Sequence, residues 1–138
     1  MPAKILVVED DPDARQMLQV VLSDEGYTVL TAEDGQAALR LLDKECPDLV
    51  VTDIQMPNLD GIGLTRSLRG CPQWRKIPVL VLTAQGSEGL AEAMMEGANE
   101  GLRKPAQLAS VIDLIKRLLA PACSVWLLTL AGITARVL

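Results

Sequence analysis

Five short aliphatic segments alternate with segments of helical periodicity along this chain of 138 residues. Four of the aliphatic segments lie at 4–8, 28–32, 49–52 and 78–82, and a weaker one lies near Leu102. Short apolar runs bounded by turn residues are typical of strands that are buried on both faces. The alternation therefore predicts one α/β domain, in which a parallel sheet carries helices on both faces and the crossovers are right-handed.

The segments between the predicted strands carry apolar residues at helical spacing. Asp11 before Pro12 supplies an N-cap and a first-turn proline, and Gly26 supplies a stop for the first helix. No repeat, low-complexity tract or linker interrupts the pattern. The apolar stripes are Ala14, Met17, Leu18, Val21 and Leu22 in the first helix, Ala38, Leu41 and Leu42 in the second, and Leu108, Val111, Ile112, Ile115 and Leu119 in the last.

The charge and the aromatic content exclude some classes of partner. The chain has 13 basic and 18 acidic residues, which gives a formal net charge of −5. We therefore expect no direct nucleic-acid binding, because that function favours a basic surface. The aromatic residues are Tyr27, Trp74 and Trp126, which leaves little to stack on nucleobases or on a flavin ring.

The cysteines and the start of the chain indicate a cytoplasmic protein. Cys46, Cys71 and Cys123 show no CxxC spacing, which favours reduced thiols with a packing role over disulfides or zinc ligands. The segment from Lys4 reads as a strand and lacks the apolar core and cleavage site of a secretory signal. Cytoplasmic localisation is the expectation.

Acidic residues gather at the ends of two predicted strands. Glu9, Asp10 and Asp11 follow the first strand, and Asp53 ends the third. The carboxyl ends of parallel strands meet at one edge of the sheet, where ligands bind in open α/β folds. Several carboxylates at one edge need a cation, and oxygen ligands in a chain without histidine favour Mg²⁺ over zinc. We expect Asp11 to cap its helix, and Asp10 and Asp53 to serve the cation site.

Motifs at the strand ends resemble those of the response-regulator receiver family. The motifs are Val-Val-Glu-Asp-Asp at 7–11, Asp-Ile-Gln-Met-Pro-Asn-Leu-Asp-Gly at 53–61, Leu-Thr-Ala at 82–84, Gly-Ala at 97–98 and Lys-Pro at 104–105. The resemblance covers about residues 3–120. It implies a flavodoxin-like, doubly wound (βα)5 fold with a five-stranded parallel sheet in the order 2-1-3-4-5. It also implies a receiver domain over 1–120, followed by an apolar C-terminal extension over 121–138.

The resemblance further implies a role for each matched residue at the acidic edge. Asp53 matches the aspartate that is phosphorylated in the family. Glu9 and Asp10 match the acidic pair that holds Mg²⁺ together with Asp53. Gln55 matches the residue whose backbone carbonyl completes the metal site, a role that needs no particular side chain.

Three more matched residues belong to the family's phosphoryl pocket. Thr83 matches the switch hydroxyl that moves to bond the phosphoryl group, and Ala84 matches the small neighbour that leaves room for it. Lys104 matches the cation that contacts the phosphoryl oxygens. Pro105 after it resembles a proline that is often in a cis peptide bond.

One position departs from the family pattern. The family usually carries a tyrosine or phenylalanine that swings inward when the switch hydroxyl moves, and the matching residue here is Gly101. A glycine has no side chain to swing, and it weakens a strand. The resemblance therefore leaves phosphorylation intact and puts the output signal in doubt. Backbone movement around Gly86 and Gly89, or rearrangement of the tail, are the alternatives.

The function that the sequence predicts is a receiver domain of a two-component phosphorelay. Such a domain accepts a phosphoryl group from a sensor histidine kinase or a phosphotransfer protein and signals to a downstream protein. It is a signalling phospho-acceptor, not an enzyme for metabolites, and it catalyses its own phosphorylation and slow autodephosphorylation.

Three alternative functions remain open. The first is a magnesium-dependent aspartyl phosphohydrolase, but Gln55 stands where such enzymes place a second acid. The second is a flavodoxin-like cofactor binder, whose phosphate loop would be rich in glycine and hydroxyl groups, not acidic. The third is a degenerate receiver that acts only through protein interaction, against which the residues Asp53, Thr83 and Lys104 argue.

The extension from Pro121 to Leu138 is unusually apolar, with no charged residue from Leu118 through Ala135. Pro121 interrupts the run and Arg136 lies near its end, so the run is marginal for spanning a membrane. The open interpretations are membrane attachment, a segment whose sequence is an accident of the reading frame, and a protein contact. The favoured one is packing, on the chain's own domain or, slightly preferred, across a homodimer.

Overall fold

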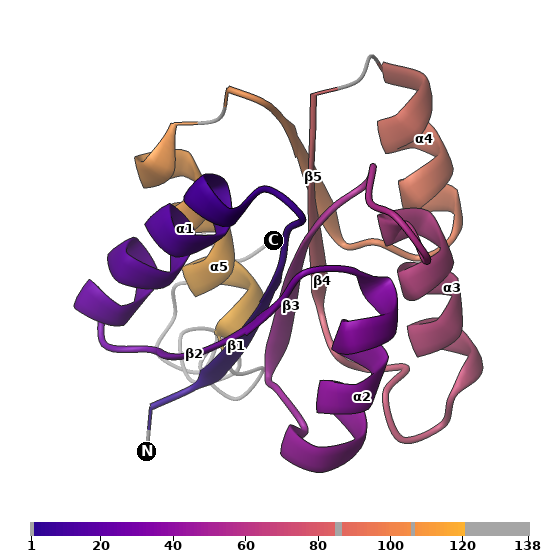
Figure 1. Cartoon of the computed structure of the whole chain (residues 1–138), viewed down its shortest axis with the longest axis horizontal. Coiled ribbons are helices and arrows are strands. Elements are labelled where there is room, and N and C mark those ends of the chain that lie inside the picture. Colours follow the sequence, from indigo (N-terminus) through magenta and orange to yellow (C-terminus); the bar gives the residue numbers. More distant parts are fainter. Residues whose placement is uncertain (1, 85–86, 106, 121–138) are drawn as a thin grey trace, which may run out of the picture.

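The computed structural model describes residues 2–84, 87–105 and 107–120, and within them five strands alternate with five helices (Figure 1). The strands form one parallel sheet in the order β2-β1-β3-β4-β5. This confirms the predicted fold and strand order. The elements are β1 (Lys4–Val8), α1 (Pro12–Asp24), β2 (Thr28–Ala32), α2 (Gly35–Glu45), β3 (Leu49–Asp53), α3 (Gly61–Gly70), β4 (Val79–Thr83), α4 (Ser87–Met95), β5 (Glu100–Arg103) and α5 (Leu108–Leu119).

The helices cover the sheet from both sides. Helices α1 and α5 lie on one face, and α2, α3 and α4 lie on the other (Figure 1). Alternate residues of the central strands divide between the two cores because successive side chains of a strand point to opposite faces. Ile5 and Val7 pack with Leu22 and Ile115 on the α1/α5 side. Leu6 and Val8 belong to the core on the other side.

Burial is less uniform than the aliphatic runs predicted. Strands β1, β3 and β4 are buried almost throughout, but the edge strands β2 and β5 are mostly half-buried or exposed. The prediction that every strand is buried on both faces was wrong for these two, since an edge strand has a neighbour on one side only. The apolar stripes likewise include exposed members, with Met17 55% and Leu108 36% exposed.

The cysteines also differ from expectation. The described cysteines, Cys46 and Cys71, are free thiols, as predicted. Cys46, however, is exposed at the C-terminal end of α2, where it adopts a left-handed backbone with φ of 46°. Its predicted packing role was therefore wrong. Cys123 lies outside the described residues.

Aspartates begin three of the helices. Asp11 caps α1 through Asp13 N, as the sequence predicted, and Gly26 follows that helix with φ of 97°. Asp34 and Asp60 cap α2 and α3 through the backbone N–H groups of Ala37 and Gly63. An N-cap carboxylate satisfies a backbone donor that the helix itself leaves unpaired.

A clamp centred on Arg69 joins the segments at the amino-terminal edge of the sheet. The Arg69 guanidinium donates to the carbonyl oxygens of Gly97 at 3.0 Å and Ile77 at 2.8 Å, and to Asn99 Oδ1 at 2.8 Å. Asn99 Oδ1 also accepts from Val79 N at 2.8 Å. This clamp fixes α3 to the starts of β4 and β5, at the edge opposite the acidic residues.

The predicted C-terminal extension over 121–138 lies outside the described residues, so its packing and its homodimer contact stay predictions. No helix in the described ranges combines the length and the apolar character needed to cross a membrane.

Candidate functional site

The fold brings the predicted acidic residues to one point at the carboxyl edge of the sheet. Glu9 and Asp10 follow β1, and Asp53 ends the adjacent β3. Each of these side chains offers a carboxylate oxygen, and the three oxygens lie within 4.8 Å of one another. Glu9 is buried, Asp53 is 9% exposed and Asp10 is exposed. The cluster is therefore open to solvent on the Asp10 side.

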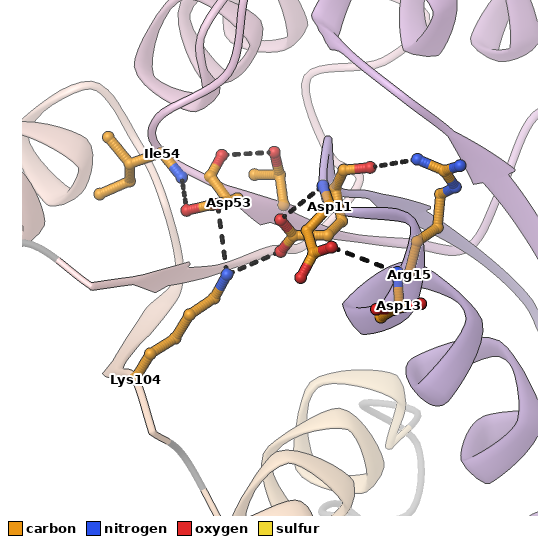
Figure 2. Close-up of polar contacts among 8 residues, drawn as sticks. Asp11, Asp13, Arg15, Asp53, Ile54 and Lys104 are labelled. Atoms are coloured by element: carbon orange, nitrogen blue, oxygen red, sulfur yellow. Dashed lines mark hydrogen bonds and ion pairs between the residues drawn. The ribbon is translucent and has the colours of Figure 1, made fainter.

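Lys104 reaches this cluster from the end of β5. Its ammonium group lies 2.7 Å from Glu9 Oε2 and 3.2 Å from Asp53 Oδ2, and the side chain is 28% exposed (Figure 2). One ammonium thus bridges two carboxylates that come from the ends of the adjacent strands β1 and β3. The bridge offsets part of the repulsion between the buried acids.

Burial and charge shift the pKa values of the bridged groups. Burial raises the pKa of the Glu9 carboxyl above its usual value, and the neighbouring Asp53 charge adds to this rise against the opposing hydrogen bond from Lys104. Burial alone would lower the pKa of Lys104, but its hydrogen bond to Glu9 and the nearby Asp53 charge hold that pKa above its usual value. Lys104 is therefore a fixed cation at neutral pH.

The loop between β1 and α1 is held by polar contacts of its own. Arg15 Nη1 donates to the Glu9 carbonyl oxygen at 2.8 Å, and Asp11 N donates to Glu9 Oε1 at 3.3 Å. Asp13 N donates to Asp11 Oδ1 at 3.3 Å, which is the helix cap (Figure 2). The contact of Arg15 with Glu9 was not predictable from the sequence, since a basic residue in the first turns of a helix gives no signal of which loop atom it meets.

Asp53 is fixed by its own backbone neighbourhood. Ile54 N donates to Asp53 Oδ1 at 2.7 Å (Figure 2), and Thr52 Oγ1 donates to the Asp53 carbonyl oxygen at 2.8 Å. A Cβ atom at Gly61 would lie 2.2 Å from the same carbonyl oxygen. Helix α3 therefore begins in direct contact with the backbone of Asp53, and a glycine permits that approach. One carboxylate oxygen is restrained, and the other faces Lys104.

A polar cleft of about 600 Å³ opens beside the cluster. Asp10, Gln55 and Met56 are among its lining residues, together with Gly89 and Glu92 of α4. The Gln55 side chain is exposed. The cleft therefore opens to solvent at Asp10, the exposed member of the cluster.

The remaining predicted site residues lie on the neighbouring strand ends. Thr83 ends β4, is fully buried and pairs with Arg103 of β5, and Ala84 follows it exposed to solvent. The peptide bond between Lys104 and Pro105 is cis, as the resemblance implied. A mainly apolar cavity of about 420 Å³ includes Glu9, Ala84 and Lys104 in its lining.

Leu90 occupies the space beside Gly101. A Cβ atom at Gly101 would lie 2.6 Å from Leu90 Cδ2 and 3.1 Å from Val81 Cγ2. Helix α4 thus packs closely over β5 at the position where the family usually carries an aromatic ring. Of the two glycines named as alternative hinges, Gly89 is buried in α4 and Gly86 lies outside the described residues.

The donor atoms suit a hard cation. The cluster consists of carboxylate oxygens, the described residues around it provide no thiolate, and the chain contains no histidine. Mg²⁺ prefers oxygen ligands and retains several waters, and an exposed Asp10 leaves room for these. Glu9, Asp10 and Asp53 are the residues that fit such an ion.

Comparisons with known proteins agree with this geometry. Residues 5–116 match the family described as the response regulator receiver domain. An uncharacterised 14.6 kDa protein of Leptolyngbya boryana is 40% identical over 114 residues, which are 82% of this chain and 87% of that protein. Response regulator MprA of Mycolicibacterium vanbaalenii is 42% identical over 120 residues, which are 86% of this chain and 51% of MprA. The chain thus spans about half the length of that relative.

One of the solved structures similar to this chain contains a magnesium ion. The receiver domain of the sensor histidine kinase PA1611 from Pseudomonas aeruginosa has a magnesium ion coordinated in its active site cleft. Its structure superposes on this chain with a TM-score of 0.80 at 31% identity, over 86% of this chain and 98% of that one.

Proposed function

Because this chain belongs to the response regulator receiver domain family of two-component signalling, we propose that it accepts a phosphoryl group on Asp53 from a phosphohistidine. The donor is a sensor histidine kinase or a phosphotransfer protein. The observation that carries the proposal is the approach of Lys104 to Asp53 Oδ2 at 3.2 Å, beside two further carboxylates. This combination gives a nucleophile, a fixed cation and a cation-binding edge at one place.

The chemistry follows from these groups. A carboxylate oxygen of Asp53 attacks phosphorus, an oxygen–phosphorus bond forms, the donor's nitrogen–phosphorus bond breaks, and its electron pair stays on the imidazole nitrogen. Both reactants are anionic, so the step requires positive charge around the phosphoryl oxygens. Lys104 supplies one positive charge. A bound Mg²⁺ would supply two more, held by Glu9, Asp10, Asp53 and the backbone carbonyl of Gln55.

Thr83 and Ala84 complete the proposed phosphoryl pocket. Thr83 lies at the end of β4, next in the sheet to β3 with Asp53, and its hydroxyl is the group we assign to bonding the phosphoryl oxygens. Ala84 is the small neighbour that leaves room for them. Hydrolysis of the acyl phosphate by water from the cleft returns the carboxylate and makes the signal transient.

The partners belong to the same proposal. They are a histidine kinase or phosphotransfer protein and a downstream protein, in the cytoplasm. The MprA relatives are about twice as long as the matched region, so the output of a longer protein does not transfer to this chain. The tail over 121–138 is a candidate contact between two copies.

Phosphotransfer tests the function. We expect the full chain to gain one phosphoryl group from a small-molecule phosphodonor with Mg²⁺, and to gain it far more slowly when the metal is chelated. Intact mass before and after hydroxylamine treatment measures the adduct, because acyl phosphates react with hydroxylamine. An unmodified mass at saturating donor and metal would favour the degenerate receiver.

Asp10→Ala tests the metal site. We expect its affinity for Mg²⁺ to fall by about tenfold or more, since loss of a direct ligand costs at least as much as loss of an outer partner. Isothermal calorimetry measures the dissociation constant. Asp13→Ala is the matched control, because Asp13 is an exposed acid of the same segment. Equal affinities for the two variants would exclude Asp10 as a ligand.

A further inference from the structure

We propose that Asp34 and Asn58 form a positioning pair that holds the loop over 54–60, and with it the backbone carbonyl of Gln55, in place at the metal site. The inference rests on the proposed function, because it concerns the same Mg²⁺ site. Neither residue touches the carboxylate cluster. Their role is to fix the loop that carries one of its ligands.

Asp34 uses both carboxylate oxygens. Oδ1 accepts from Ala37 N at 2.8 Å, which is the cap of α2, and Oδ2 accepts from Asn58 Nδ2 at 2.7 Å. The side chain is buried, with the residue 6% exposed. The Ala37 and Asn58 hydrogen bonds, in that order, hold the pKa of Asp34 below its usual value, so the pair is charge-assisted at neutral pH.

A second contact ties the same part of the loop to the start of α2. Gly35 N donates to the Leu59 carbonyl oxygen at 3.1 Å, and a Cβ atom at Gly35 would lie 2.5 Å from that oxygen. Asn58 itself has φ of 70°, in the left-handed region that asparagine tolerates better than most residues. Helix α2 and the loop therefore fit together closely at residues 34–35 and 58–59.

A separate backbone hydrogen bond joins the two ends of the loop. Gly61 N donates to the Ile54 carbonyl oxygen at 2.8 Å, which closes the segment between Ile54 and Gly61. Within that closed segment Leu59 N donates to the Pro57 carbonyl oxygen at 2.8 Å. Gln55 is exposed and lies between the closure and the Asp34 contact. The backbone of Gln55 is thus held by the Ile54–Gly61 hydrogen bond on one side and by the Asp34–Asn58 hydrogen bond on the other. The second of these is the side-chain contact.

Two variants break the contact in different ways. Asp34→Ser keeps a good N-cap residue for α2 and removes the oxygen that Asn58 uses. Asn58→Gly removes the amide while a glycine adopts the positive φ without strain. We expect each to weaken Mg²⁺ binding by about tenfold, the lower end of the cost of losing a contact that orients a metal ligand, because the pair acts on Gln55 only through the loop backbone. The double variant should bind Mg²⁺ about as tightly as the single variant with the larger loss of affinity, because both substitutions remove the same interaction.

Two control variants separate positioning from general effects. Glu33→Gln removes an exposed charge next to Asp34 and should leave the Mg²⁺ affinity unchanged. Asn99→Ala breaks the Arg69 clamp at the opposite edge of the sheet, so it should lower the free energy of unfolding without changing that affinity. Calorimetry on full chains that circular dichroism shows to be folded measures the binding.

The outcomes are distinct. Weaker binding in both test variants with a non-additive double variant supports the positioning pair. Any of three results overturns the positioning pair while the proposed function stands. These are wild-type Mg²⁺ affinity in either test variant, additive losses of affinity in the double variant, and an equal loss of affinity in Asn99→Ala. If the wild-type chain itself binds no Mg²⁺, the proposed metal site and this inference both fail.

Discussion

Replacing Lys104 with alanine is expected to slow phosphorylation of Asp53 by about 100-fold or more while the chain stays folded. Removal of one preorganised positive group from a site where charge develops typically costs this much. The Lys104 side chain is 28% exposed and belongs to neither hydrophobic core, so its loss removes charge more than core. The rate of adduct formation, followed by intact mass with a small-molecule donor, measures the effect.

The same variant should bind Mg²⁺ more tightly. The ammonium lies against Glu9 Oε2 and Asp53 Oδ2, which are oxygens that also belong to the proposed metal set, so the lysine and the metal compete for them. Lys116→Ala is the matched control, because Lys116 pairs with Glu25 on the surface at 3.5 Å. A Lys104→Ala protein that is phosphorylated at the control's rate would remove Lys104 from the mechanism.

Gly61→Ala is expected to destabilise the fold by about 3 kcal/mol, at the upper end of the usual cost of overpacking. The added Cβ atom would meet the Asp53 carbonyl oxygen at 2.2 Å and Ile54 Cα at 2.9 Å. These are backbone atoms of a buried strand and its first loop residue, so no side chain can turn aside to make room. Either α3 or the end of β3 must move, and the second movement displaces Asp53.

Gly70→Ala, in the last turn of the same helix, is the control. A Cβ atom at Gly70 would meet nothing within 4 Å, so this change should be neutral or stabilising by up to about 1 kcal/mol. Urea unfolding followed by circular dichroism gives both values. Equal free energies of unfolding for the two variants would mean that α3 does not begin against Asp53 as described.

The fold was largely predictable from the sequence because its signals are local. Four of the five strands are short aliphatic runs, the exception being β5, and Asp11, Pro12 and Gly26 mark the two ends of α1 within a few residues. Burial at the sheet edges was less predictable. Thr28–Ala32 has three aliphatic residues, as many as the fully buried Leu49–Asp53, and its edge position follows from strand order, which single runs do not encode.

The acidic part of the candidate site was also predictable, since Glu9, Asp10 and Asp53 end strands that must share one edge of a parallel sheet. The approach of Lys104 to Glu9 was not, because the two residues lie 95 positions apart and the contact depends on the order of the strands. Asp34 was missed for a related reason. Its position before Gly35 marks a helix start, but the use of its second oxygen for Asn58 is a tertiary contact.

The structure shows which side chain lies beside Gly101, the position at which this sequence departs from the family pattern. The sequence showed that no ring is present at this position, and the structure shows that Leu90 from α4 lies over the glycine. A change at the end of β4 therefore meets a close contact between α4 and β5 in place of a rotating aromatic side chain.

Phosphotransfer to the wild-type chain and to Asp53→Asn tests the central claim most directly. Both proteins are incubated with a small-molecule phosphodonor and Mg²⁺, and peptide mass spectrometry locates any adduct that hydroxylamine removes. We expect one adduct on the wild type, in the peptide that contains Asp53, and none on Asp53→Asn. An equal quantity of adduct on both proteins, or an adduct located on another residue, would contradict the assignment of Asp53 as the phospho-acceptor.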